Sequence, residues 1–130
     1  MSEQELLELA RKAWRAVSES DVATLEEVWS PELVWHATSR GAPWAGRHVG
    51  WEAVLDYLAR VGESVERFDA RLDDILVGAE RIAYIFHVLL KRGDRVVDVD
   101  YLLLARLEKD KAVEIWTAPL DPAALEAFWA

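Results

Sequence analysis

The stretch from Arg81 to Pro119, RIAYIFHVLLKRGDRVVDVDYLLLARLEKDKAVEIWTAP, decides the fold. It contains three segments rich in β-branched and other apolar residues, 81–91, 96–107 and 112–118. Two short polar turns separate these segments, and Gly93 followed by Asp94 is typical of a hairpin. The stretch therefore predicts an antiparallel meander of three strands.

The middle strand of this meander is apolar on both of its faces. Side chains alternate along a strand, so residues two apart share a face. One face holds Val97, Val99, Tyr101, Leu103 and Ala105, and the other holds Val96, Asp98, Asp100, Leu102 and Leu104. A strand of this kind is covered on both sides. We therefore expect the rest of the chain to cover this sheet.

The rest of the chain alternates between helical and extended patterns. Helices are predicted at 4–18, from Ser20 or Asp21 to Trp29 (stopped by Ser30-Pro31), at 50–61 with Gly62 as its C-cap, and at 122–129. Strands are predicted at 33–37 and 65–77, and the segment 38–49, rich in glycine and proline, is predicted to be a loop. The segment 65–77 is expected to join the meander as a fourth strand.

This order of elements predicts a single α+β domain over residues 1–130. We expect a curved, mostly antiparallel sheet, three N-terminal helices that form a cone around an apolar pocket, and a short C-terminal helix. Seven tryptophans in 130 residues favour a cavity or an interface walled by aromatic side chains.

Charge and composition exclude several classes of function. The net charge of −9 disfavours nucleic-acid binding and attachment to anionic membranes. The chain has no cysteine, and its three histidines have no metal-ligand spacing, so we expect no metal and no cofactor. Residues 1–5 do not resemble a signal peptide, and no apolar run reaches membrane-spanning length. We therefore expect a cytoplasmic protein.

Several stretches together resemble a known family. They are the helix segment 13–21, the strand 33–36, the segment 45–55, Glu114-Ile-Trp116, and the tail 121–130. Their order and spacing are similar to those of SnoaL-like proteins, within the group that shares the fold of nuclear transport factor 2 and ketosteroid isomerase. The resemblance implies a cone with a deep apolar pocket, often in a homodimer. This fold hosts cyclases, isomerases and non-catalytic binders, so fold alone does not define function.

The resemblance also allows the acid and base positions of these relatives to be compared with this sequence. Trp14 stands where ketosteroid isomerase has a tyrosine, and Ala37 stands where it has its catalytic base. Leu103 occupies the position of a second oxyanion donor, and Ala118 lies where the cyclases have an aspartate. Steroid isomerisation by the familiar mechanism is therefore not expected.

The same register predicts which residues line the pocket. They are Trp14, Trp29, Trp35, Ala37, Tyr84, Phe86, Val88, Val99, Tyr101, Leu103, Ala105, Trp116 and Ala118. Small residues opposite aromatic ones leave room for a flat, apolar ligand. The alternative is an ordinary packed core.

Three residues are candidates for catalysis: His36, Tyr101 and Asp100. His36 neighbours the base position and titrates near neutral pH, although strand alternation turns it away from the pocket. Tyr101, like Tyr84, could donate a hydrogen bond to a ligand carbonyl, or it could be satisfied by a backbone carbonyl. Asp100 and Asp98 fall on the face opposite Tyr101, where they are surface or interface groups unless a β-bulge turns one inward.

The loop and the outer face of the sheet add two further expectations. His48 could touch a ligand at the pocket entrance, and Arg40 and Arg47 either bind a carboxylate or enolate or are solvated. The outer face carries an apolar patch that predicts a homodimer through twofold self-pairing. The patch comprises Ile85, Leu89, Leu102, Leu104 and Ile115.

Two hypotheses for function follow. The first is a SnoaL-like enzyme of the isomerase or cyclase type that acts on a small hydrophobic carbonyl or polycyclic compound by proton transfer. The second is a non-catalytic small-molecule binder, or an engineered scaffold, without the acid and base residues of the family. The two differ in whether an ionisable group reaches the pocket.

Overall fold

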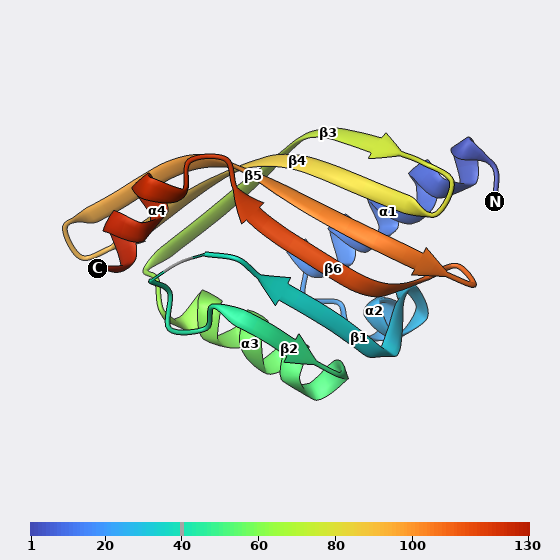
Figure 1. The fold of residues 1–130 in the computed structure, drawn as a ribbon, viewed down its shortest axis with the longest axis horizontal. Helices are drawn as coiled ribbons and strands as arrows, with labels where there is room; N and C mark the ends of the chain where they lie inside the picture. The colour runs from blue at the N-terminus through green and yellow to red at the C-terminus, as the bar shows by residue number, and fades with distance from the viewer. Residues whose placement is uncertain (40) are drawn as a thin grey trace.

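The structure is a computed structural model that describes residues 1–39 and 41–130. These residues form four helices and six strands (Figure 1). The helices are α1 (Glu3–Ser18), α2 (Val22–Val28), α3 (Trp51–Glu63) and α4 (Pro122–Trp129). The strands are β1 (Trp29–Ala37), β2 (Gly46–Val49), β3 (Arg67–Val77), β4 (Arg81–Arg92), β5 (Arg95–Glu108) and β6 (Lys111–Pro119).

The described strands form one sheet in the order β2-β1-β6-β5-β4-β3. The strands β3 to β6 are joined in sequence and are antiparallel, so the predicted meander is confirmed. β1 pairs with β6 in parallel, with Trp35 beside Ile115, and β2 is antiparallel to β1. The predicted α+β class is confirmed, and the sheet is mixed because of the single parallel pair.

We call the face of the sheet that carries Trp35, Tyr84, Leu103 and Ile115 the inner face, and the opposite one the outer face. α1, α2 and α3 lie across the inner face, and α4 lies at one end of the sheet (Figure 1). The register of the described sheet shifts at three points: between Leu72 and Asp74 of β3, between Trp29 and Val34 of β1 where it pairs with β6, and between β5 and β6 near Arg106. Such bulges bend a sheet and increase its twist.

The ends of the helices follow from local side-chain chemistry. Ser2 and Glu5 form a capping box at the start of α1. Asp21 caps α2, and Asp121 caps α4 directly before Pro122. The N-terminal boundaries of these helices were therefore predictable from the sequence.

Three predicted boundaries are wrong. The segment 38–49 is not all loop, because Gly46–Val49 forms β2 and pairs with β1. Ser30-Pro31 does not end a helix but lies at the beginning of β1, where a proline is tolerated near the first residue of a strand. Gly62 lies inside α3, and the C-cap is Ser64 with ordinary right-handed backbone angles, so no glycine is required there.

Candidate functional site

A cavity of about 850 Å³ lies between the inner face of the sheet and the helices. Small-molecule sites in proteins have volumes of about 300–1,000 Å³. Trp14 of α1, Leu25 of α2 and Leu58 of α3 line one side, while Phe86 of β4 and Leu103 of β5 line the other. The cavity is therefore enclosed by segments from both halves of the chain.

Aromatic rings pack against one another around this cavity. The ring of Trp14 is stacked on Tyr84 at a centroid distance of 5.9 Å and meets the edge of Phe86 at 5.1 Å. Phe86 in turn stacks on Tyr101 at 5.5 Å with an interplanar angle of 21°. Contacts of this kind add about 0.5–1.5 kcal/mol per pair beyond burial. These ring contacts therefore hold the aromatic wall in place.

A cluster of hydroxyl groups and one indole N–H also faces the cavity. We call it the polar cluster, and its residues are Ser39, Tyr57, Tyr101, Thr117 and Trp35. The hydroxyls of Ser39 and Tyr101 are 3.1 Å apart, and the indole nitrogen of Trp35 donates to Thr117 Oγ1 at 3.2 Å. These residues come from α3, β1, β5, β6 and the segment after β1, so the whole fold positions them.

The phenols of the polar cluster are held in their neutral form. Burial raises the pKa of Tyr57 to about 12, and the nearby Tyr101 adds to this, while the Thr117 hydroxyl opposes it. Burial also raises the pKa of Tyr101, and its hydrogen bond with Ser39 partly opposes the shift. At neutral pH both phenols can therefore donate a hydrogen bond.

Tyr84 lines the same cavity but is already satisfied. Its hydroxyl donates to the backbone carbonyl of Ala10 at 2.9 Å. Burial raises its pKa as well. Of the two tyrosines proposed from the sequence, Tyr101 faces another hydroxyl and Tyr84 fastens β4 to α1.

The structure brings most of the predicted pocket residues of α1, β1, β4 and β5 to the cavity. Trp14, Trp29, Trp35, Tyr84, Phe86, Val88, Tyr101, Leu103 and Ala105 all line the cavity. Ala37 and Val99 are buried on the inner face but are not among the residues that line it. They belong to the packed part of the core.

The assignments for β6 are wrong by one residue. Trp116 and Ala118 lie on the outer face, while Ile115 and Thr117 face inward beside Ala105 and Leu103. The cause is the bulge at Val113: Leu107 pairs with Ala112, but Arg106 pairs with Glu114. One extra residue shifts the alternation and exchanges the two faces.

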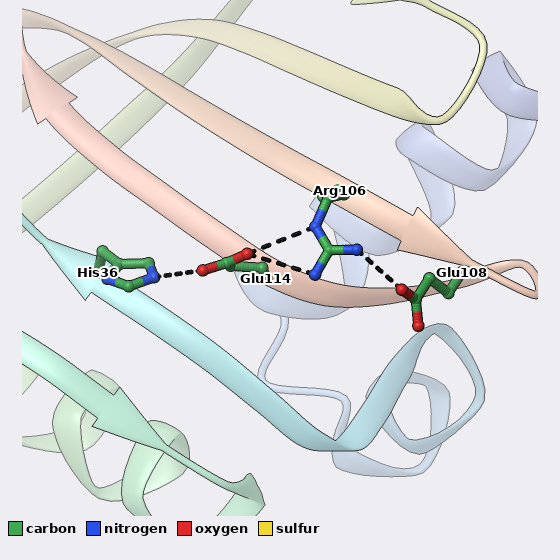
Figure 2. Close-up of polar contacts among 4 residues, drawn as sticks. All are labelled: His36, Arg106, Glu108 and Glu114. Carbon is green, nitrogen blue, oxygen red and sulfur yellow. Dashed lines mark hydrogen bonds and ion pairs between the residues drawn. The ribbon is translucent and has the colours of Figure 1, made fainter.

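His36 also lies on the outer face. Its ring stacks on Trp116 at 5.3 Å, and its Nε2 is 2.7 Å from Glu114 Oε2. Glu114 contacts Arg106 at 3.3 Å, and Arg106 contacts Glu108 at 2.9 Å (Figure 2). The hydrogen bond with His36 lowers the pKa of Glu114, and Arg106 adds to that effect. His36 is therefore part of a surface ion-pair network and not of the cavity.

Asp100 lies on the outer face as well. Its carboxylate is 2.7 Å from His87 Nδ1, and Asp98 contacts the other nitrogen of the same ring. Neither aspartate is turned inward by a bulge, as β5 keeps a regular register with β4 from Arg95 to Arg106. Of the three catalytic candidates, only Tyr101 lines the cavity.

The predicted loop residues lie elsewhere. His48 stacks on Tyr57 at 4.4 Å and is hydrogen-bonded to the carbonyl of Trp44 at 2.7 Å, so it supports the cavity wall without lining it. Arg47 is exposed on β2. Arg40 lies outside the described residues.

Three residues of the polar cluster were not predicted. Tyr57 follows Val54 by three residues on the apolar side of α3, and this helical spacing was a usable signal. Thr117 was missed because the bulge at Val113 exchanges the two faces of β6, and Trp116 and Ala118 were predicted to face inward instead. Ser39 follows β1 in a segment with no periodicity, so no sequence signal identified it.

Comparison with known proteins places the fold in a family. Residues 10–115 match the family model described as the SnoaL-like domain. The chain belongs to the SnoaL-like family. The whole chain is 23% identical to the full length of an uncharacterized protein of Mycobacterium tuberculosis.

Solved structures share this SnoaL-like fold. Bal32a, from a soil-derived mobile gene cassette, superposes with a TM-score of 0.86 and 25% identity over 95% of each chain. A putative SnoaL-like polyketide cyclase from Jannaschia sp. CCS1 superposes with a TM-score of 0.81 and 14% identity, covering 100% of this chain and 96% of the other. At that identity the second comparison shows the fold alone.

Residues 1–39 and 41–130 contain no set of three or more His, Cys, Asp or Glu side chains that could hold a metal ion. Within the same residues no helix is long and apolar enough to cross a membrane.

The neutral phenols give a pH prediction. Because the folded-state pKa of Tyr57 is about 12, above the value of about 10 for an exposed tyrosine, the folded state resists ionisation between these values. The resulting stability is fully present below pH ~10 and is lost as the pH rises toward ~12. We expect the tyrosinate absorbance of the folded protein to stay low at pH ~10, where the denatured protein is half ionised. A half-complete titration of the folded protein at that pH would contradict the burial of these groups.

Proposed function

We propose that this SnoaL-like protein binds a small, flat, hydrophobic carbonyl or polycyclic compound in its cavity. The observation that carries the proposal is an aromatic-walled space of about 850 Å³ into which neutral hydroxyl donors project. Tyr101 and Tyr57 would donate hydrogen bonds to the ligand oxygen, and Trp14 and Phe86 would contact its flat apolar surface.

In such a complex, apolar contact would supply most of the affinity and hydrogen bonds most of the selectivity. Burial of apolar surface contributes roughly 25 cal/mol per Å². A hydrogen bond adds about 0.5–1.5 kcal/mol net, and it matters more for selectivity because an unpaired buried hydroxyl is costly. The ligand should therefore be mostly hydrocarbon with an oxygen atom at the position of the polar cluster.

The cavity favours binding over proton transfer. Among the described residues that line it, the only charged side chain is Asp69, and no histidine is present. Asp69 is ion-paired with Arg67 at 2.5 Å, and its side chain is 55% exposed. A general base has to reach the carbon acid within about 3 Å, which this outward-turned carboxylate does not favour.

An enzymatic role is the second candidate, and one observation favours it. Tyr57 and Tyr101 are neighbouring phenols with raised pKa values, an arrangement that can stabilise the developing charge of an enolate. The Jannaschia protein of the same fold is named a putative SnoaL-like polyketide cyclase. A reaction of the isomerase or cyclase type would then need water or the substrate itself as the proton acceptor.

Ligand binding can be tested with β-acetonaphthone, a flat methyl ketone, by isothermal titration calorimetry. We expect Tyr101→Phe to weaken binding about tenfold, because one buried hydrogen bond is lost. Tyr84→Phe is the matched control: it removes the same atom from the same wall, but that hydroxyl is already bound to Ala10, so affinity should change less than about twofold. Equal losses in both variants, or no binding to the wild type, would refute the proposal.

Exchange of the methyl protons of β-acetonaphthone in heavy water separates binding from catalysis. We expect catalytic amounts of protein to leave the exchange rate at its buffer value, because the described lining offers no suitably placed base. Acceleration that disappears in Tyr101→Phe would instead favour the enzymatic candidate.

We also propose that the outer face pairs with a second copy of the chain. Leu102, Leu104 and Trp116 are only half-buried there. Ile85 of β4 pairs with Leu102, and Leu89 lies farther along β4 opposite Asp98. Ile115, which was expected in this patch, is instead buried on the inner face. Apolar surface in the middle of a sheet favours a self-complementary twofold interface.

Light scattering at micromolar concentration tests this pairing. We expect a dimer for the wild type and a monomer for Leu104→Glu, because a carboxylate placed in the patch could not be buried. Leu120→Glu is the control, since Leu120 is 60% exposed and follows β6, and it should remain dimeric. A wild-type monomer would remove the proposal.

A further inference from the structure

We infer that the cavity selects uncharged ligands and rejects carboxylates and other anions. The inference rests on the proposed function and specifies the substrate class: a neutral ketone, enol or alcohol on a hydrocarbon framework. Two observations on the described residues support it: the polar cluster that faces the cavity consists of uncharged hydroxyl and indole groups, and the nearby arginines do not line the cavity.

The polar cluster offers hydroxyl groups that can both donate and accept. In the Ser39–Tyr101 pair either oxygen can be the donor. The Thr117 hydroxyl accepts from the indole of Trp35, and it also acts on the Tyr57 phenol, where it partly opposes the rise in pKa. Such groups can serve a carbonyl, which only accepts, and equally a hydroxyl, which does both. They offer no formal charge to a ligand anion.

Positive charge is missing from the described cavity lining. None of the lining residues within 1–39 and 41–130 is a lysine, arginine or histidine. A carboxylate transferred from water to such a place loses its hydration without gaining an opposite charge, which costs several kcal/mol. The high pKa values of Tyr57 and Tyr101 are consistent with the same penalty acting on the protein's own potential anions.

The arginines at the α4 end of the sheet are bound by other groups. Trp129 lines the cavity, and the guanidinium carbon of Arg92 lies over the Trp129 ring, 5.1 Å from its centroid. Arg92 donates to the carbonyl of Phe128 at 2.8 Å, and Arg95 donates to the same carbonyl at 3.2 Å. Both therefore fasten the C-terminal helix, and neither lines the cavity.

The mouth of the cavity adds to the exclusion of anions. Val17, Val22 and Phe68 line the cavity and are yet 37%, 43% and 48% exposed, so they mark the opening. The single charged group of the described lining, Asp69, follows Phe68 at this opening and is paired with Arg67, so it adds little net charge there. The whole chain carries a net charge of −9, which also opposes the approach of anions.

A matched pair of probes tests the inference. β-Acetonaphthone and β-naphthoate share one ring system and differ in that a methyl group replaces a charged oxygen. By calorimetry at neutral pH we expect the naphthoate to bind at least ~50-fold more weakly than the ketone. Equal or tighter binding of the naphthoate would overturn the inference while leaving the proposed function intact. Failure of both probes to bind would overturn the proposed function, and the inference with it.

A second pair of variants tests whether the missing positive charge causes the weak binding of β-naphthoate. Ala70 lines the cavity from β3, is exposed, and lies near the mouth. Ala70→Gln has a similar length without charge and is the reference variant. Ala70→Arg should bind β-naphthoate at least about tenfold more tightly than Ala70→Gln does, with no comparable gain for the ketone. An arginine variant that binds the naphthoate no better than the glutamine variant would overturn the inference.

Discussion

The parallel pairing of β1 with β6 is the contact on which the rest of the structure depends. It joins the first third of the chain to its last strand and sets Trp35 beside Ile115 and Ala37 beside Thr117. On the inner face this register brings the indole of Trp35 to Thr117 and completes the polar cluster. On the outer face it brings His36 to Glu114 and to the ring of Trp116. One register therefore builds both the cavity and the surface that we propose pairs with a second copy.

Most of the fold could be predicted because its signals are local. Apolar alternation, short polar turns and capping residues defined the meander and the helices, and alternation from Val97 correctly placed Tyr101 and Leu103 inward. The errors arose where pairing between segments that are distant in sequence determines the structure. β2 exists because Gly46–Val49 meets β1, and the bulge at Val113 exchanges the two faces of β6. Apolar residues on both faces of β6 concealed that shift.

The candidate site was harder to predict than the fold. The aromatic wall could be predicted from the alternation of side chains along the strands and their spacing along the helices. The polar cluster, in contrast, contains Ser39, Tyr57 and Thr117 from three different segments. These three residues form a site only because the fold brings them together. His36 and Asp100 show the opposite case: each has a residue type suited to catalysis, but alternation turns its side chain outward into an ion pair. The cavity of this SnoaL-like protein thus presents hydroxyl groups at Ser39, Tyr57, Tyr101 and Thr117, while Trp14, Ala37, Leu103 and Ala118 stand at the positions compared with the acids and bases of the family.

We propose that the sheet and helices enclose a cavity that accepts a flat carbonyl compound. A crystal structure of the protein grown with β-acetonaphthone tests this proposal most directly. We expect the ring system beside Trp14, Phe86 and Leu103, with its carbonyl oxygen within hydrogen-bond distance of the Tyr101 or Tyr57 hydroxyl. Side chains that fill the same volume, or a ligand bound only on the outer face, would contradict it.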